Sequence, residues 1–112
     1  MKTKKPFKDP LLNIADLSEM IGTKPHILSK VLNESFHKNF RDFINEYRVN
    51  EFIGLAGSTE FKNYTFLALS YEVGFNSKST FNLAFKKITK KSPREYFNEH
   101  GITESRISES SH

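Results

Sequence analysis

Apolar residues in this 112-residue chain recur three and four positions apart, which is the spacing of one face of an α-helix. No stretch alternates apolar and polar residues long enough to predict a strand, so we predict an all-α protein. Helices are expected over residues 14–21, 24–35, 40–56, 66–73, 78–88 and from 93 onward. The apolar residues assigned to their buried faces are Ile14, Leu17, Ile21, Ile27, Leu28, Val31, Leu32, Phe40, Phe43, Ile44, Tyr47, Leu55, Phe66, Leu69, Val73, Phe81, Ala84, Phe85 and Ile88.

Residues that favour helix ends stand at these boundaries. Side chains of Ser, Thr and Asn accept hydrogen bonds from the free amides of a first helical turn. Such N-caps are expected at Asn13, Thr23, Asn39, Thr65, Ser77 and Ser92. Ser92 is followed by a proline suited to the first turn and by Glu95 at the capping-box position. Gly22 and Gly74 are expected to end the first and fourth helices.

The chain contains an internal sequence repeat. Residues 17–22, Leu-Ser-Glu-Met-Ile-Gly, return 52 positions later as Leu-Ser-Tyr-Glu-Val-Gly. After each glycine the offset is 53, and it pairs Leu28 with Phe81 and residues 39–43 with residues 92–96. We therefore expect a first unit over residues 11–38, a linker helix over 39–57, and a second unit over 64–99. Residues 1–10 and 101–112 are expected to be flexible.

Charge adds a candidate partner. The net charge is +4, and residues 78–94 carry six basic residues and no acidic one. A lesser basic cluster lies within residues 2–8. A localised basic surface favours a polyanion such as nucleic acid, although a solvated lysine-rich face would look the same. The chain has no cysteine, no apolar run near 18 residues and no signal peptide pattern, so we expect a cytoplasmic protein.

A short helix, a glycine turn and a second amphipathic helix form the helix-turn-helix arrangement, whose second helix reads the DNA major groove. Opposite their apolar sides, the second helices here carry His26, Ser29, Lys30 and Asn33 in one copy and Lys78, Ser79, Asn82 and Lys86 in the other. Asparagine can pair with adenine, and lysine can reach guanine or phosphate. One such helix would be weak support, because any surface helix has a polar side. Two copies are stronger support. The linker helix makes a rod of about 25 Å, and with the width of the flanking helices it could hold the two second helices about 34 Å apart, one turn of B-DNA.

The residues also carry a family resemblance. Residues 69–87, Leu-Ser-Tyr-Glu-Val-Gly-Phe-Asn-Ser-Lys-Ser-Thr-Phe-Asn-Leu-Ala-Phe-Lys-Lys, and residues 92–96, Ser-Pro-Arg-Glu-Tyr, resemble the C-terminal signature of AraC/XylS bacterial transcription regulators. Residues 16–22, 28–34 and 43–49 resemble the first unit and linker helix of the same family. The resemblance covers about residues 11–97.

The resemblance implies a homeodomain-like domain of seven helices, with two helix-turn-helix units that enter successive major grooves. Carried over by position, the DNA-binding residues would be Lys24, His26, Ser29, Lys30, Asn33, Ser77, Lys78, Ser79, Asn82, Lys86 and Lys87, of which Lys24, Lys86 and Lys87 would lie near the phosphates. Free amides at the start of the linker helix and at residues 92–94 would hold phosphates. The implied partners are promoter or operator double-stranded DNA, RNA polymerase, and an N-terminal sensor or dimerisation region outside this chain.

Several positions depart from the family pattern. His37 and Lys90 stand where relatives usually have glycine, which predicts tight or strained turns. Leu83 and Phe97 each stand where arginine is common. The family's first helix would lie upstream of residue 10, so we expect that helix to be reduced here.

Two other classes of function stay open at this point. A helical protein-interaction module would show outward-facing apolar residues, of which Leu83 is one. An enzyme is disfavoured, because the four histidines have no partner at metal-ligand spacing and no nucleophile–base set or phosphate-binding glycine loop is present. We therefore expect no catalytic residues and no cofactor.

Overall fold

The structure is a computed structural model that describes residues 5–99. Its elements are a short 3-10 helix η1 (Pro6–Lys8) and the helices α1 (Ile14–Met20), α2 (Pro25–Ser35), α3 (Phe40–Ala56), α4 (Phe66–Glu72), α5 (Lys78–Thr89) and α6 (Pro93–Glu99). No strand occurs among these residues, and the predicted all-α class is confirmed. The implied seventh helix is represented in this part of the chain by the single turn η1.

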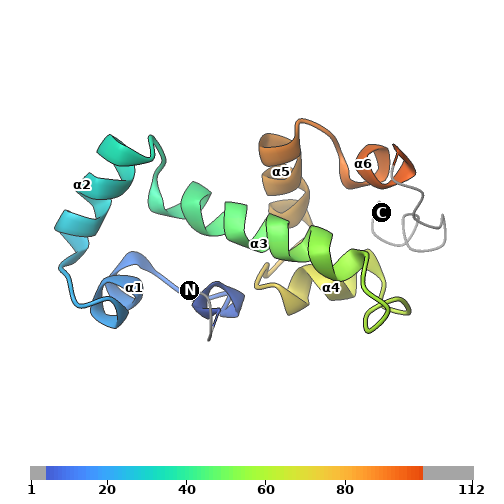
Figure 1. Ribbon diagram of the computed structural model, residues 1–112, viewed down its shortest axis with the longest axis horizontal. Helices are drawn as coiled ribbons and strands as arrows, with labels where there is room; N and C mark the ends of the chain where they lie inside the picture. Colours follow the sequence, from blue (N-terminus) through green and yellow to red (C-terminus); the bar gives the residue numbers. More distant parts are fainter. Residues whose placement is uncertain (1–4, 100–112) are drawn as a thin grey trace.

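The long helix α3 organises the domain. In Figure 1 it runs along the length of the molecule, with α2 and α5 on one side of it and α1 and α4 on the other. Both α2 and α5 stand steeply to the axis of α3. The molecule measures 44 × 25 × 20 Å, so its length follows the direction that separates the two units.

Most of the predicted helix starts are confirmed, because the side chain of the cap accepts a hydrogen bond of 2.8–3.2 Å from a backbone amide. The amide of Asp16 donates to Asn13, Asp42 to Asn39, Ala68 to Thr65, Thr80 to Ser77 and Glu95 to Ser92. The predicted cap at Thr23 is wrong. Lys24 is the N-cap of α2, and it makes no side-chain capping bond. The amide of Thr23 instead donates to the carbonyl of Ser18 at 2.9 Å, so this residue belongs to the end of α1.

The sequence repeat is also a repeat of structure. Gly22 and Gly74 both adopt positive φ, +78° and +111°. The residue after each glycine donates to a serine carbonyl five positions back, from Thr23 to Ser18 at 2.9 Å and from Phe75 to Ser70 at 3.0 Å. This bond is the mark of a Schellman end, which directs the chain sharply into the next helix. The two units therefore turn by the same mechanism.

Two apolar cores lie at the two ends of α3. The smaller one contains Phe7, Leu12, Leu17, Leu28, Leu32 and Ile44. The larger one is aromatic, and the ring of Phe52 lies 4.6 Å from that of Phe81 and 5.7 Å from that of Phe97. Phe97 is buried in this cluster, which explains why an apolar residue is suited to a position where relatives carry arginine. Because Ile44 and Phe52 lie on one continuous helix, α3 belongs to both cores.

Some residues assigned to buried faces are exposed. Ile21, Ile27, Val31 and Tyr47 retain 58%, 45%, 43% and 42% of their surface. The repeat gives the physical reason for Val31: its equivalent in the second unit, Ala84, is buried on α5, which packs along α3. The corresponding side of α2 stays exposed at Val31.

The segment before α1 packs against the linker helix. Residues 1–10 were expected to be flexible; residues 1–4 lie outside the described part, as do residues 101–112. Phe7 is buried, and its ring stacks on Tyr47 at 5.8 Å. Lys5 and Lys8 lie 2.7 and 3.4 Å from the carboxylate of Glu51 on α3. Burial acts to raise the pKa of Glu51, but the bonds and charges of both lysines outweigh it and hold that pKa below its usual value.

Arg48 of α3 is the buried charge that the sequence analysis missed. Its Nε donates to the carbonyl of Phe7 at 2.7 Å and its Nη2 to that of Asp9 at 3.0 Å. Its guanidinium also lies over the ring of Phe75, 5.8 Å from the centroid. Burial lowers the pKa of Arg48, and the charge of Asp9 opposes that shift. One side chain thus joins the N-terminal segment, the linker helix and the turn that leads into α5.

Candidate nucleic-acid interface

The outward face of α2 is polar and accessible. His26, Lys30 and Asn33 are exposed, and Ser29 is half-buried beside them. Asn33 donates to the carbonyl of Ser29 at 2.9 Å, so its amide group is held along the helix. Among the described residues no carboxylate lies within ion-pair distance of Lys30. Its ammonium is therefore available to a ligand.

The outward face of α5 differs from the one expected. The exposed residues of α5 are Ser79, Thr80, Leu83, Lys86 and Lys87, and among them Ser79, Leu83 and Lys86 lie four and three residues apart in one stripe. Lys78 and Asn82 are half-buried at the edge of this stripe. An exposed apolar residue therefore occupies the centre of the face that the sequence analysis described by its polar members.

Ser77 has a structural role. Its hydroxyl oxygen accepts the amide of Thr80 at 3.1 Å and lies 2.8 Å from the hydroxyl of the same residue. The oxygen proposed to contact DNA is thus already engaged at the start of α5. Lys24, at the matching position of α2, is exposed and has no such bond.

The two lysines at the end of α5 also differ. Lys87 lies 2.8 Å from the carboxylate of Asp42 and so ties α5 to the first turn of α3. Lys86 is exposed, and no ion pair to it is found among the described residues. We expect the free ammonium of Lys86 to contribute more to a phosphate contact.

The helix N-termini that were predicted to hold phosphates are partly occupied. At α6, the amide of Ser92 donates to Glu95 and the amide of Glu95 donates to Ser92, at 3.1 and 3.2 Å. Hydrogen bonds from the backbone amide and the side chain of Ser92 to the carboxylate of Glu95 lower the pKa of that residue, so a carboxylate stands at that helix start. At α3, Asn39 accepts the amide of Asp42, which leaves the amides of Phe40 and Arg41 as candidates.

A groove of about 550 Å³ lies between the start of α1, the first half of α3 and the start of α5, and its lining includes Asn13, Arg41, Asn76 and Thr80. Arg41 is exposed there at the start of α3. Arg41 is not among the predicted DNA-binding residues, although its equivalent in the repeat is also an arginine, Arg94. An exposed guanidinium beside such a groove is suited to a phosphate.

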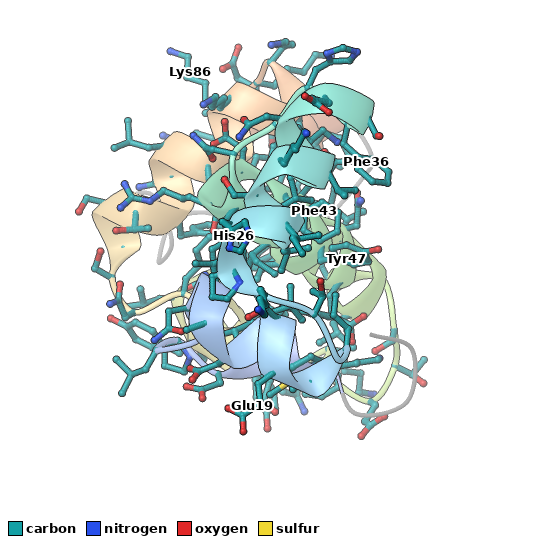
Figure 2. All side chains as sticks on the ribbon, turned by 90° about the vertical axis from the view of Figure 1, so that its left-hand side faces the viewer. Glu19, His26, Phe36, Phe43, Tyr47 and Lys86 are labelled. Atoms are coloured by element: carbon teal, nitrogen blue, oxygen red, sulfur yellow. The ribbon has the colours of Figure 1, made fainter. Side chains whose placement is uncertain are left out.

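A row of aromatic residues lies elsewhere on the molecule. Phe36, Phe43 and Tyr47 follow one another at ring distances of 5.8 and 5.2 Å. Figure 2 shows these three on one side and Lys86 on the opposite side of the molecule. This row is the kind of exposed apolar surface that a protein-interaction module would show, and it lies away from the basic end of α5.

Other kinds of site find no support in the described residues. No group of three or more His, Asp or Glu side chains there is placed to hold a metal ion. No helix of residues 5–99 is long and apolar enough to cross a membrane.

Comparison with known proteins defines the class. The model of a helix-turn-helix domain family matches residues 17–99, which span both units and the linker helix. The chain belongs to this family. Within it, the resemblance to the C-terminal domain of AraC/XylS regulators is confirmed, and the chain is a DNA-binding domain of a bacterial transcription regulator.

The similar curated proteins are much longer than this chain. The TCP pilus virulence regulatory protein of Vibrio cholerae is 37% identical over 82 residues, which are 73% of this chain and 28% of that protein. An uncharacterised HTH-type transcriptional regulator of Staphylococcus aureus is 31% identical over 85 residues, 76% of this chain and 11% of that protein. The chain therefore spans less than a third of each.

Solved structures share the fold. The C-terminal domain of AraT, a response regulator from Geobacillus stearothermophilus, superposes with a TM-score of 0.67 at 21% identity and covers 89% of this chain and 80% of its own. The C-terminal domain of the response regulator yesN from Fusobacterium nucleatum gives 0.64 at 27% identity, with coverage of 83% and 87%.

Proposed function

We propose that α2 and α5 enter successive major grooves on one face of a DNA duplex. The observation that carries this proposal is that both helices lie on the same side of the single rod α3 (Figure 1). The 44 Å length of the molecule is sufficient to span one turn of B-DNA, about 34 Å.

Within this arrangement each exposed polar residue has a role that fits its chemistry. His26, Lys30 and Asn33 of α2 read base edges, with Ser29 at the margin. Lys24, Arg41 and Lys86 contact phosphates, because exposed cations position a protein on the duplex without reading sequence. On α5, Ser79 faces the bases, while Lys78, Asn82 and Lys87 lie at the edges of the interface.

The longer regulator to which this domain corresponds has further parts. We infer that an N-terminal sensor or dimerisation region belongs to it and that its DNA-bound state acts on RNA polymerase in the cytoplasm. The lengths of the similar regulators support the first inference, because the matched segment is a minor part of each. We also infer that the domain itself is not an enzyme and takes no cofactor.

The experiment that tests this proposal is selection of bound duplexes from a random pool, followed by titration of the winning sequence at several salt concentrations. We expect two sub-sites about 10 base pairs apart, and an affinity that falls steeply with salt. Lys30→Ala should weaken the selected duplex by about 1–3 kcal/mol and relax the preference in one sub-site. A single sub-site would contradict two-groove binding, and a pool that shows no enrichment would contradict sequence reading altogether.

A further inference from the structure

Leu83 is the least expected residue of the candidate interface. It retains 73% of its surface, more than any other large apolar residue of α5. It lies between Ser79 and Lys86 in the exposed stripe of that helix. Single exposed leucines are common on protein surfaces, so exposure alone decides nothing. Its position on the helix is what distinguishes this leucine.

The internal repeat fixes that position. With the offset of 53, Leu83 corresponds to Lys30, Ser79 to His26, and Lys86 to Asn33. All six side chains are exposed, so the equivalence holds in the folded domain. Leu83 therefore occupies on α5 the central place that Lys30 occupies on α2.

Most of the neighbours of Leu83 are polar. It borders a second groove of about 220 Å³, which is lined by the apolar residues Ala84 and Ile88 and by Arg41, Asp42, Asn45, Thr80 and Lys87. An apolar protein partner on this groove would have to bury these charged and polar groups as well as the leucine. Burial of unpaired polar groups is costly. A ligand that is rich in polar groups and has one apolar group opposite Leu83 fits these surroundings better.

A DNA major groove has that composition. Its floor carries hydrogen-bond donors and acceptors, and its one apolar group is the C5-methyl of thymine. A leucine has no donor or acceptor, so it gains nothing at guanine, cytosine or adenine edges. We propose that Leu83 recognises a thymine in the second sub-site through contact with its C5-methyl group. This inference rests on the proposed insertion of α5 into the major groove.

Deoxyuridine tests the contact directly, because it differs from thymidine only in lacking that methyl group. Each thymine of the selected duplex is replaced in turn, and the affinity of the domain is measured. We expect one position, or two adjacent ones, in the second sub-site to lose about fourfold in affinity, the effect of removing one methyl from an apolar contact. Thymines in the first sub-site serve as internal controls.

Two variants separate direct contact from an effect of the methyl on DNA shape. Leu83→Ala should bind the thymine and deoxyuridine duplexes equally at that position, while it keeps the preferences of the first sub-site. Leu83→Lys introduces the residue type that stands at the equivalent position of α2, and it should replace the preference for thymine by one for guanine. Both side chains are exposed at this site, so the melting temperature should stay unchanged and report an intact fold.

The outcomes distinguish this inference from the proposal beneath it. If the wild type binds a two-part site but no replacement changes its affinity, the role of Leu83 is wrong. If Leu83→Ala still discriminates thymine from deoxyuridine, the methyl acts through another residue or through shape, and the role is again wrong. If no duplex is selected at all, the proposed function fails instead.

Discussion

The Nε of Arg48 lies 2.7 Å from the backbone carbonyl of Phe7, a residue 41 positions earlier in the chain. The same guanidinium reaches the carbonyl of Asp9 at 3.0 Å and the side chain of Asn45 at 3.3 Å. Three acceptors from two segments thus converge on one buried cation. Arginine suits this place because its planar group presents five donors in fixed directions.

Replacement of Arg48 should therefore destabilise the domain. Arg48→Ala leaves the buried carbonyl of Phe7 without a donor, whereas the carbonyl of Asp9 still accepts the amide of Leu12. We expect a loss of about 1–3 kcal/mol in the free energy of unfolding. Urea denaturation measures it. Arg41→Ala, an exposed change on the same helix, is the control and should cost less than about 0.5 kcal/mol. Equal losses for the two variants would mean that the buried bonds contribute nothing specific.

The two equivalent glycines should tolerate alanine differently. A Cβ on Gly74 would lie 2.3 Å from the carbonyl oxygen of Phe7 and 2.8 Å from Nε of Arg48, whereas a Cβ on Gly22 meets nothing within 4 Å. Both positions have positive φ, which alone costs an alanine about 1–2 kcal/mol. Gly22→Ala should cost that amount, and Gly74→Ala clearly more. Thermal melts that rank them alike would contradict the close approach of the N-terminal segment.

Two positions offer a gain in stability. His37 and Lys90 adopt φ of 56° and 69°, in the left-handed region, where relatives usually have glycine. Glycine removes the strain of about 1–2 kcal/mol but loses part of it to the greater freedom of the unfolded chain. His37→Gly and Lys90→Gly should each stabilise by about 0.5–1 kcal/mol in chemical denaturation. His37→Ala keeps the strained conformation, and a gain for that variant would point to another cause.

The salt dependence of DNA binding should separate the two lysines at the end of α5. Lys86→Ala should weaken binding to all duplexes alike and reduce the salt slope by about 0.9, one phosphate contact. Asp42→Asn should strengthen binding, because it frees Lys87 from its ion pair. Glu60→Gln makes the same charge change in the exposed loop after α3 and is the control. If it strengthens binding as much as Asp42→Asn does, the effect comes from net charge alone.

Local rules predicted most of the fold. The caps at Asn13, Asn39 and Thr65 depend on residues three positions apart, and such local signals can be recognised in a single sequence. The same is true of Gly22 and Gly74, whose conformation follows from the missing side chain. Thr23 shows the limit, because two rules competed there and the end of α1 took precedence over the start of α2.

Contacts between segments that are distant in the chain could not be predicted from the sequence. Val31 has the spacing of a core residue, but whether it is covered depends on a neighbour that periodicity does not supply. Arginine is usually a surface residue, and only the fold brings carbonyls of the N-terminal segment to Arg48. In the candidate site, the pairing of Lys87 with Asp42 is of the same kind. The equivalence of Lys30 and Leu83, by contrast, was present in the sequence repeat from the start.

One continuous helix serves both cores, with Ile44 in the first and Phe52 in the second. The rod α3 has no hinge between the units, so it fixes the rotation of α2 relative to α5. DNA rotates by roughly a tenth of a turn for each added base pair. An operator read in this way cannot gain or lose a single base pair between its halves without turning one of them out of phase. Its spacer would change only by whole turns, and a whole turn exceeds the reach of the domain.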